Sequence, residues 1–140
     1  IIDPKGDTLS KYKGASVITP NFSEFCTVTK KKNKTEKDVH TASLQLIKRY
    51  HLDALLLTRS EKGMSLITSD KKEDIPTQAK EVYDITGAGD TVIAVFSLCL
   101  GMGLSLIEAA QVANYAAGIV VGKVGTATTT WDEMFRMANT

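Results

Sequence analysis

The sequence contains little cysteine, no excess of either charge and no long hydrophobic run. Its two cysteines, Cys26 and Cys99, lie far apart, and neither a Cys-x-x-Cys pair nor Cys and His at metal-ligand spacing is present. This argues against a disulfide framework or a structural zinc site and favours buried free thiols in a reducing compartment. His40 and His51 have no acidic or cysteine partner at ligand spacing, so we expect no metal at either residue.

The charge balance gives no general reason to expect nucleic acid or a membrane as partner, because the 17 Lys and Arg residues are nearly balanced in number by 16 Asp and Glu residues. The lysine run at residues 30–34 lacks interleaved aromatics, so we interpret it as a solvated loop between helices. No apolar run approaches the roughly 20 residues that span a bilayer, and the start of the chain lacks the pattern of a signal peptide. We therefore expect a cytoplasmic protein. Because the chain starts at Ile1 without Met, we also expect a fragment of a longer one.

Short apolar runs alternate along the chain with segments of helical periodicity, a pattern typical of α/β proteins. The run at residues 54–58 is continuous and too short for a helix, which predicts a strand buried on both faces of a parallel sheet. Its polar end is expected at the carboxyl edge, where such sheets bind ligands. The other expected elements are strands at residues 17–19 and 63–68, a charged turn at 70–74, an extended stretch at 81–83, and helices beginning near residues 22, 36, 91, 106 and 131. We expect the helix from residue 91 to end at Gly101 and Gly103.

The most informative segment runs from Asp84 to Asp90, directly before an apolar stretch. Glycine lets the backbone turn sharply and approach a ligand, so the N–H groups of Gly87, Ala88 and Gly89 can point at one cluster of anionic oxygens at the start of a helix. A carboxylate beside a bound phosphate is explained if it accepts a proton from a substrate hydroxyl that lies between them. The segment therefore indicates phosphoryl transfer, with Asp90 as the general base.

Other interpretations of the glycine-rich segments are open. Residues 87–92 share the start of the dinucleotide-binding fingerprint, but Val92 stands at the third glycine position, so the signal for a dehydrogenase is weak. Residues 118–124 resemble a P-loop only superficially, because three residues separate the glycines where four are needed and Val124 replaces the hydroxyl that binds Mg²⁺. A plain turn in which Asp90 caps its own helix is a further alternative. The acid at Asp84 and the polar strand ends expected at the same sheet edge favour a functional site.

These segments resemble the ribokinase-like (phosphofructokinase B) carbohydrate kinases, whose Asp-Thr-Gly-Ala-Gly-Asp signature corresponds to residues 84–90. The resemblance covers nearly the whole chain: residues 19–24 look like the Asn-x-x-Glu magnesium motif of the family, and residues 58–63 look like its phosphate-binding loop. Residues 3–6, 57–64 and 120–126 look most like the heptose 7-phosphate kinases within the family. The resemblance implies a three-layer αβα, Rossmann-like fold. Residues 1–140 would be the C-terminal, ATP-binding part of the kinase domain, without its sugar-binding half and lid.

The resemblance also implies a role for each site residue. Asp90 would take the proton from the anomeric hydroxyl of D-glycero-D-manno-heptose 7-phosphate, while the N–H groups of residues 87–89 would hold the transferred phosphoryl group. Asn21 and Glu24 would position Mg²⁺ through water, and Lys5 is a candidate contact to a substrate phosphate. The ATP site would be formed by Thr58, Ser60 and Gly63 along the phosphates and by Asn114, Ala117, Val121 and Gly125 around the adenine. A monovalent cation near Asp84 and Thr86 is left open.

The implied partners are ATP and a sugar phosphate, in a full-length homo-oligomer that binds neither nucleic acid nor membrane. The product, a heptose 1,7-bisphosphate, would enter ADP-heptose synthesis for the lipopolysaccharide core. Two rivals remain: a ribokinase-like kinase for another sugar or nucleoside, and a non-catalytic nucleotide-binding module. Without the lid and the sugar-binding half, we expect the chain alone to bind nucleotide weakly and to phosphorylate nothing measurable.

Overall fold

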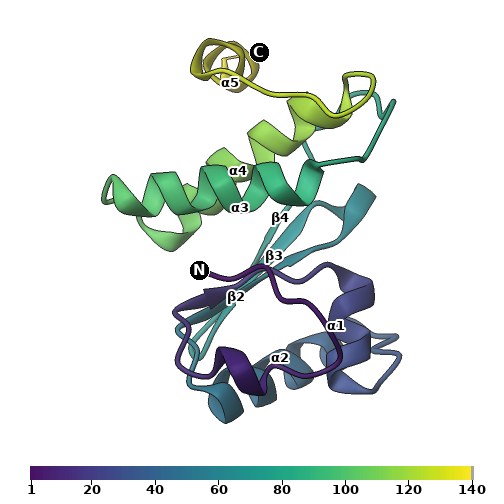
Figure 1. Ribbon diagram of the computed structural model, residues 1–140, viewed down its shortest axis with the longest axis vertical. Helices are drawn as coiled ribbons and strands as arrows, with labels where there is room; N and C mark the ends of the chain where they lie inside the picture. The colour runs from purple at the N-terminus through teal and green to yellow at the C-terminus, as the bar shows by residue number, and fades with distance from the viewer. Residues whose placement is uncertain (140) are drawn as a thin grey trace. The chain divides into compact units, whose positions relative to one another are not determined.

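The computed structural model, shown in Figure 1, describes residues 1–139. The chain forms two compact units, one made of residues 1–59 and 65–74 and the other of residues 60–64 and residues 75 onward. The first unit contains most of a four-stranded sheet with two helices, and the second consists mainly of three helices. The chain is therefore an α/β protein, as predicted.

The sheet of the first unit is mixed. Strand β1 (Val17–Ile18) pairs in parallel with β2 (Ala54–Thr58), with Val17 opposite Ala54. Strands β3 (Met64–Thr68) and β4 (Lys72–Ile75) extend the sheet in the order β1-β2-β3-β4. Because the connections at residues 59–63 and 69–71 are too short for a crossover, β3 and β4 run antiparallel to their neighbours. The predicted parallel pairing is thus confirmed for β1 and β2, whereas β3 and β4 add an antiparallel hairpin.

One face of the sheet is covered by α1 (Phe22–Thr29) and α2 (Glu36–Tyr50). Phe25 from α1 and Val39 and Ile47 from α2 share one apolar cluster with Leu55 and Leu57 of β2. Each such side chain contributes about 1.5–3 kcal/mol when fully buried. The intervening Leu56 is also fully buried, which confirms the predicted strand buried on both faces. A short 3₁₀ turn, η1 (Ser10–Tyr12), precedes β1.

The prediction of a charged turn at residues 70–74 is wrong, because the turn is shorter and β4 begins at Lys72. The backbone N–H of Thr68 donates to the carbonyl of Lys71 at 2.9 Å, which closes the hairpin. Side chains two residues apart in a strand point to the same face. Lys72 Nζ accordingly pairs with Asp74 Oδ2 at 2.5 Å and with Glu36 Oε2 of α2 at 3.2 Å. These ion pairs keep a highly charged segment in the sheet.

The second unit contains η2 (Ser60–Lys62), α3 (Ala88–Gly101), α4 (Leu106–Val121) and α5 (Trp131–Ala138). Helices α3 and α4 lie side by side in Figure 1. Small residues permit this close packing, since Ala109, Ala113 and Ala116 of α4 have no exposed surface. None of the helices described between residues 1 and 139 is long and apolar enough to cross a membrane.

Helix α3 begins at Ala88, three residues before the predicted Thr91. Gly87 is its N-cap with a left-handed φ of 80°, so the turn is completed inside the glycine segment and the helix follows at once. At the other end, Gly101 is the last helical residue and Gly103 adopts φ 92°, which confirms the predicted stop.

Residues 76–84 form no strand, and part of this segment runs along α4 instead. Asn114 Nδ2 donates to the carbonyl of Pro76 at 2.7 Å, and the carbonyl of Val121 accepts the N–H of Tyr83 at 2.8 Å. Between these two contacts, a Cβ on Gly118 would lie 3.1 Å from the backbone nitrogen of Ala79. The absence of a side chain at Gly118 therefore lets the backbone of residues 78–79 pack closely against α4.

Candidate functional site

The N-terminal end of α3 differs from the other helix starts. Helices α1, α2, α4 and α5 each begin with a reciprocal capping box, in which a side chain satisfies free backbone N–H groups. The N-cap of α3 is Gly87, which has no side chain to offer, and no side-chain cap is formed there. Gly89 and Asp90 in the first turn are exposed. The turn therefore presents backbone donors and one carboxylate to solvent.

Some backbone N–H groups of this turn have a hydrogen-bond acceptor within the chain and others have none. The N–H of Ala88 donates to the carbonyl of Ile85 at 3.2 Å, and that of Thr91 donates to the carbonyl of Gly87 at 3.0 Å. Within residues 1–139, the N–H groups of Gly89 and Asp90 have no recorded acceptor. These two groups are thus free to bind an anion, which the positive end of the helix dipole also favours.

Asp84 fixes the loop that leads into this turn. Its Oδ1 accepts the backbone N–H of Thr86 at 2.8 Å. Hydrogen bonds from the side chain and backbone of Thr86, with a smaller contribution from the backbone of Gly125, lower the pKa of Asp84. A methyl group of Thr126 lies 3.5 Å from the position that a Cβ on Gly87 would take. The loops before α3 and after α4 therefore meet, and the predicted residues Asp84, Thr86, Gly87 and Gly125 share one region of the second unit.

The first unit brings a second set of predicted residues together at the carboxyl edge of its parallel strands. Asn21 and Thr58 form an isolated parallel bridge, and the N–H of Thr58 donates to the carbonyl of Pro20 at 3.1 Å. Asn21 Oδ1 accepts the N–H of Glu24 at 2.9 Å, and Glu24 Oε2 accepts the N–H of Asn21 at 2.9 Å. The Asn-x-x-Glu segment thus serves as the capping box of α1 and also lies beside the end of β2.

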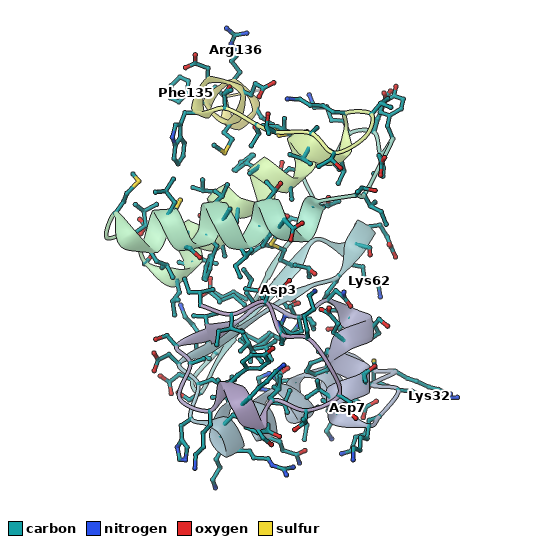
Figure 2. The ribbon with its side chains drawn as sticks, viewed as in Figure 1. Asp3, Asp7, Lys32, Lys62, Phe135 and Arg136 are labelled. Carbon is teal, nitrogen blue, oxygen red and sulfur yellow. The ribbon has the colours of Figure 1, made fainter. Side chains whose placement is uncertain are left out.

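Two carboxylates near this edge already hold one positive charge. Lys5 Nζ lies 3.0 Å from Asp3 Oδ2 and 3.1 Å from Glu24 Oε1. Hydrogen bonds to Asp3 and to Glu24 raise the pKa of the Lys5 ammonium to about 12. Figure 2 labels Asp3 on the N-terminal segment. Mg²⁺ bound here through water would share these carboxylate oxygens with the Lys5 ammonium. Residues 1–139 contain no group of three or more His, Cys, Asp or Glu side chains placed to hold a metal.

The segment after β2 has a strained backbone. Ser60 adopts φ 51°, a value uncommon for a residue with a side chain, and Gly63 adopts φ 80°. The N–H of Gly63 donates to the carbonyl of Ser60 at 2.9 Å, which closes this 3₁₀ turn. A Cβ on Gly63 would lie 2.1 Å from the carbonyl oxygen of Ile75. Only glycine therefore fits this position without movement of the backbone.

Arg59, which precedes this turn, was not predicted as a functional residue. Its Nη2 pairs with Glu36 Oε1 at 2.5 Å, its Nη1 lies 3.4 Å from Ser65 Oγ, and its Cζ lies over the ring of Phe22, 5.8 Å from the centroid. The side chain is 9% exposed. Because Glu36 lies 23 positions away in the sequence, no local pattern reveals this pair. Asp3, the partner of Lys5, was likewise given no role.

The residues of α4 that were predicted to contact the adenine are only partly accessible to a ligand. Asn114 is 4% exposed and its side-chain amide is engaged with Pro76, while Ala117 and Val121 are half-buried. The structure thus gathers Lys5, Asn21, Glu24 and Thr58 in the first unit. It gathers residues 84–90 and Gly125 in the second, with Asn114, Ala117 and Val121 on α4. The catalytic and binding roles assigned to these residues stay predictions.

The sequence is similar to curated proteins named bifunctional protein HldE. It is 54% identical over 129 residues to that of Shewanella denitrificans, a match that covers 91% of this chain and 27% of the relative. It is 51% identical over 140 residues to that of Shewanella loihica, covering 99% of this chain and 29% of the relative. The chain therefore spans less than a third of the length of these relatives.

The fold matches that of ribokinase from Thermotoga maritima, with a TM-score of 0.82 at 21% identity over 95% of this chain and 48% of the ribokinase chain. At this identity the match establishes the fold, which is ribokinase-like. The model of the pfkB family of carbohydrate kinases matches residues 1–133. This match takes in both units, including the Asn-x-x-Glu segment and the glycine turn of α3. The chain belongs to the pfkB carbohydrate kinase family.

Proposed function

We propose that this chain is the ATP-binding part of a kinase domain that transfers the γ-phosphoryl group of ATP to the anomeric hydroxyl of a heptose 7-phosphate. The observation that carries the proposal is the first turn of α3. Its N-cap is Gly87 in the left-handed conformation, which provides no side-chain cap, and the exposed Asp90 follows. We also propose that the complete kinase domain has a three-layer αβα fold. Its sugar-binding half and lid would lie outside residues 1–140.

Each part of this turn has a task in the proposed reaction. The Asp90 carboxylate accepts the proton of the sugar hydroxyl as its oxygen attacks phosphorus. The N–H groups of Gly89 and Asp90 donate to the oxygens of the transferred group, where negative charge is concentrated during transfer. Gly87, which has no side chain, leaves space for a phosphate at the N-terminus of α3. The N–H of Gly87, which has no acceptor within the described residues, is assigned to the same oxygens. The N–H of Ala88 is assigned to them as well, and it donates to the carbonyl of Ile85 at 3.2 Å in this structure.

The residues at the carboxyl edge of β1 and β2 complete the assignment. Glu24 and Asn21 would hold hydrated Mg²⁺, and the ion would neutralise charge on the phosphates of ATP. Lys5 contributes a fixed positive charge next to the same acid, and Thr58 lies beside Asn21 with a hydroxyl to offer. Ser60 and Gly63 are assigned to the ATP phosphates, and Ala117 and Val121 to the adenine. A monovalent cation would bind beside the loop that Asp84 and Thr86 form.

The assignment of substrate rests on the identity of 54% to HldE proteins, together with the resemblance of residues 57–64 and 120–126 to heptose 7-phosphate kinases. A cytoplasmic enzyme that supplies ADP-heptose synthesis is the corresponding cellular role. The sugar is expected to be read mainly by residues outside this chain.

Asp90→Asn in the full-length kinase tests the central assignment. Loss of the base should lower kcat by about 10²–10⁴-fold, because an amide cannot accept the proton. The dissociation constant for ATP should change less than threefold. Asp132→Asn, which removes the same charge from the first turn of α5, is the matched control and should leave kcat unchanged. The measurement is initial-rate kinetics with heptose 7-phosphate, together with equilibrium binding of ATP.

Unchanged turnover in Asp90→Asn would end the assignment of a general base. ATP binding by the full-length protein without phosphorylation of any sugar or nucleoside offered would favour a non-catalytic nucleotide-binding module. Efficient phosphorylation of a free pentose or a nucleoside, with none of heptose 7-phosphate, would keep the kinase and replace its substrate. These two outcomes separate the chemistry from the specificity.

A further inference from the structure

The connection between α1 and α2 contains a concave site that the proposed kinase reaction does not use. A surface hollow of about 380 Å³, open to solvent on one side and called the cavity below, is lined entirely by residues between 31 and 42 of the first unit. This volume is within the range of small-molecule sites, about 300–1,000 Å³. Its charged and amide-bearing lining residues are Lys31, Lys32, Asn33, Lys34, Lys37 and Asp38.

The cavity is strongly basic. Four lysines line it, and none of the four forms a salt bridge in the part of the chain that the structure describes. Its acid, Asp38, is engaged in the capping box of α2, where Oδ2 accepts the N–H of Thr35 at 3.0 Å, and its charge also attracts Lys31 and Lys37. Figure 2 shows the side chain of Lys32 extending outward from this loop, and the other three lysines are exposed as well.

Asn33 gives the cavity a buried polar wall. It is 5% exposed, and its left-handed φ of 42° is held by its own side chain, since Nδ2 donates to Thr29 Oγ1 at 2.7 Å and to the carbonyl of Lys31 at 3.2 Å. Its Oδ1 is buried and has no hydrogen-bond partner within the described residues. A buried acceptor without a donor is unfavourable, so this atom favours a ligand that brings a hydroxyl group.

We propose that this cavity binds a small sugar phosphate at a site separate from the kinase reaction. The ammonium groups of Lys31, Lys34 and Lys37 pair with the phosphate, and a hydroxyl of the sugar donates to Asn33 Oδ1 after a small shift of the side chain. The inference uses residues of the first unit alone and does not depend on the proposed kinase activity.

Titration of the ¹⁵N-labelled chain with ribose 5-phosphate tests the site directly. We expect saturable shifts of the backbone signals of residues 31–42 and of the side-chain amide of Asn33. Lys31→Gln/Lys34→Gln should weaken this binding at least tenfold. Lys11→Gln/Lys13→Gln, which removes the same charge next to η1, should weaken it less than twofold. Ribose without phosphate should cause no shifts at residues 31–42.

Methyl phosphate, which has no sugar hydroxyl, separates the two halves of the proposal. The chain should prefer ribose 5-phosphate at least threefold, and Asn33→Gly, which tolerates the left-handed φ, should lose that preference. Equal affinity for both probes would remove the role of Asn33. Shifts confined to residues 84–90, binding that does not saturate, or equal losses in the two lysine pairs would overturn the site. The mapping on the unmodified chain decides the matter even if a variant fails to fold.

Discussion

Glu36 links three elements of the first unit through its carboxylate. It accepts from Arg59 Nη1 at 2.9 Å and Nη2 at 2.5 Å, just beyond β2, and from Lys72 Nζ at 3.2 Å on β4. Hydrogen bonds from Arg59 and then from Lys72 lower the pKa of Glu36 to about 2. The ionised form is therefore favoured by folding, and the residue makes the stability of this unit depend on pH.

The direction of this dependence follows from the lowered pKa. The stabilisation is fully present above the ordinary value near 4.5 and is lost as the pH falls toward 2. Because the Glu36 side chain is 58% exposed, solvent screening limits the contribution to about 1 kcal/mol. Glu36→Gln should lower the free energy of unfolding by about this amount at pH 7, and the difference should shrink by pH 3. Urea unfolding at both pH values measures it.

Glu61→Gln is the matched control for this experiment, since Glu61 is exposed and forms none of the salt bridges recorded for the described residues. It should leave the free energy of unfolding unchanged at both pH values. A difference between the original chain and Glu36→Gln that stays constant from pH 7 to pH 3 would contradict the lowered pKa.

At the scale of elements, the features that were predictable are those encoded locally. The starts of α2, α4 and α5 were correct because a capping box lies within four consecutive residues. The start of α3 was placed three residues late, because the φ of Gly87 decides it and composition alone does not. Strand β4 was missed because its charges resemble those of a turn. Its stability depends on Glu36, which is distant in sequence.

The connection between β2 and β3 depends on a glycine for two separate reasons. Gly63 has φ 80°, and a Cβ there would lie 2.1 Å from the carbonyl oxygen of Ile75 and 2.5 Å from the backbone nitrogen of Thr77. Gly14 has a similar φ of 82° but open space around its Cβ position. The two positions therefore separate the cost of the backbone conformation from the cost of the clash.

Gly63→Ala should lower the free energy of unfolding by about 3 kcal/mol or more, because conformational strain and overlap with backbone atoms add. Gly14→Ala should lower it by only about 1–2 kcal/mol, the cost of the left-handed conformation. Chemical denaturation of both variants under the same conditions gives the comparison. Equal losses would show that residues 75–77 move aside freely and that the close approach has no energetic weight.

For the whole molecule, sequence patterns predicted two groups of candidate site residues but not all of their contacts. Residues 84–90 were recognisable because the turn, its glycines and the acid are contiguous. The parallel bridge between Asn21 and Thr58 was anticipated only as a common sheet edge. The pairing of Lys5 with Asp3 and Glu24, and the packing of residues 76–84 on α4, depend on tertiary structure and have no local signature.

This chain covers only part of the length of its relatives, which leads to a prediction about its activity when it is studied alone. It covers 27% of an HldE protein and 48% of a ribokinase. Exclusion of water and alignment of a sugar hydroxyl with phosphorus require a surrounding set of elements, and a misplaced reactant loses most of the rate advantage. In the proposed site, the free N–H groups of α3 remain available to a phosphate. We expect the chain to bind MgATP with a dissociation constant on the order of 1 mM or weaker, and to form no ADP when sugar phosphate is added.

Isothermal titration calorimetry and ³¹P NMR measure these two quantities, with the full-length kinase as the reference for both. If the chain alone catalysed repeated turnover, the elements needed for catalysis would all lie within residues 1–140, and the proposed division of the kinase domain would be wrong. If it bound MgATP as tightly as the full-length kinase but without turnover, the nucleotide site would be complete. The parts outside the chain would then serve the sugar alone, because equal affinity means that they add no net free energy to nucleotide binding.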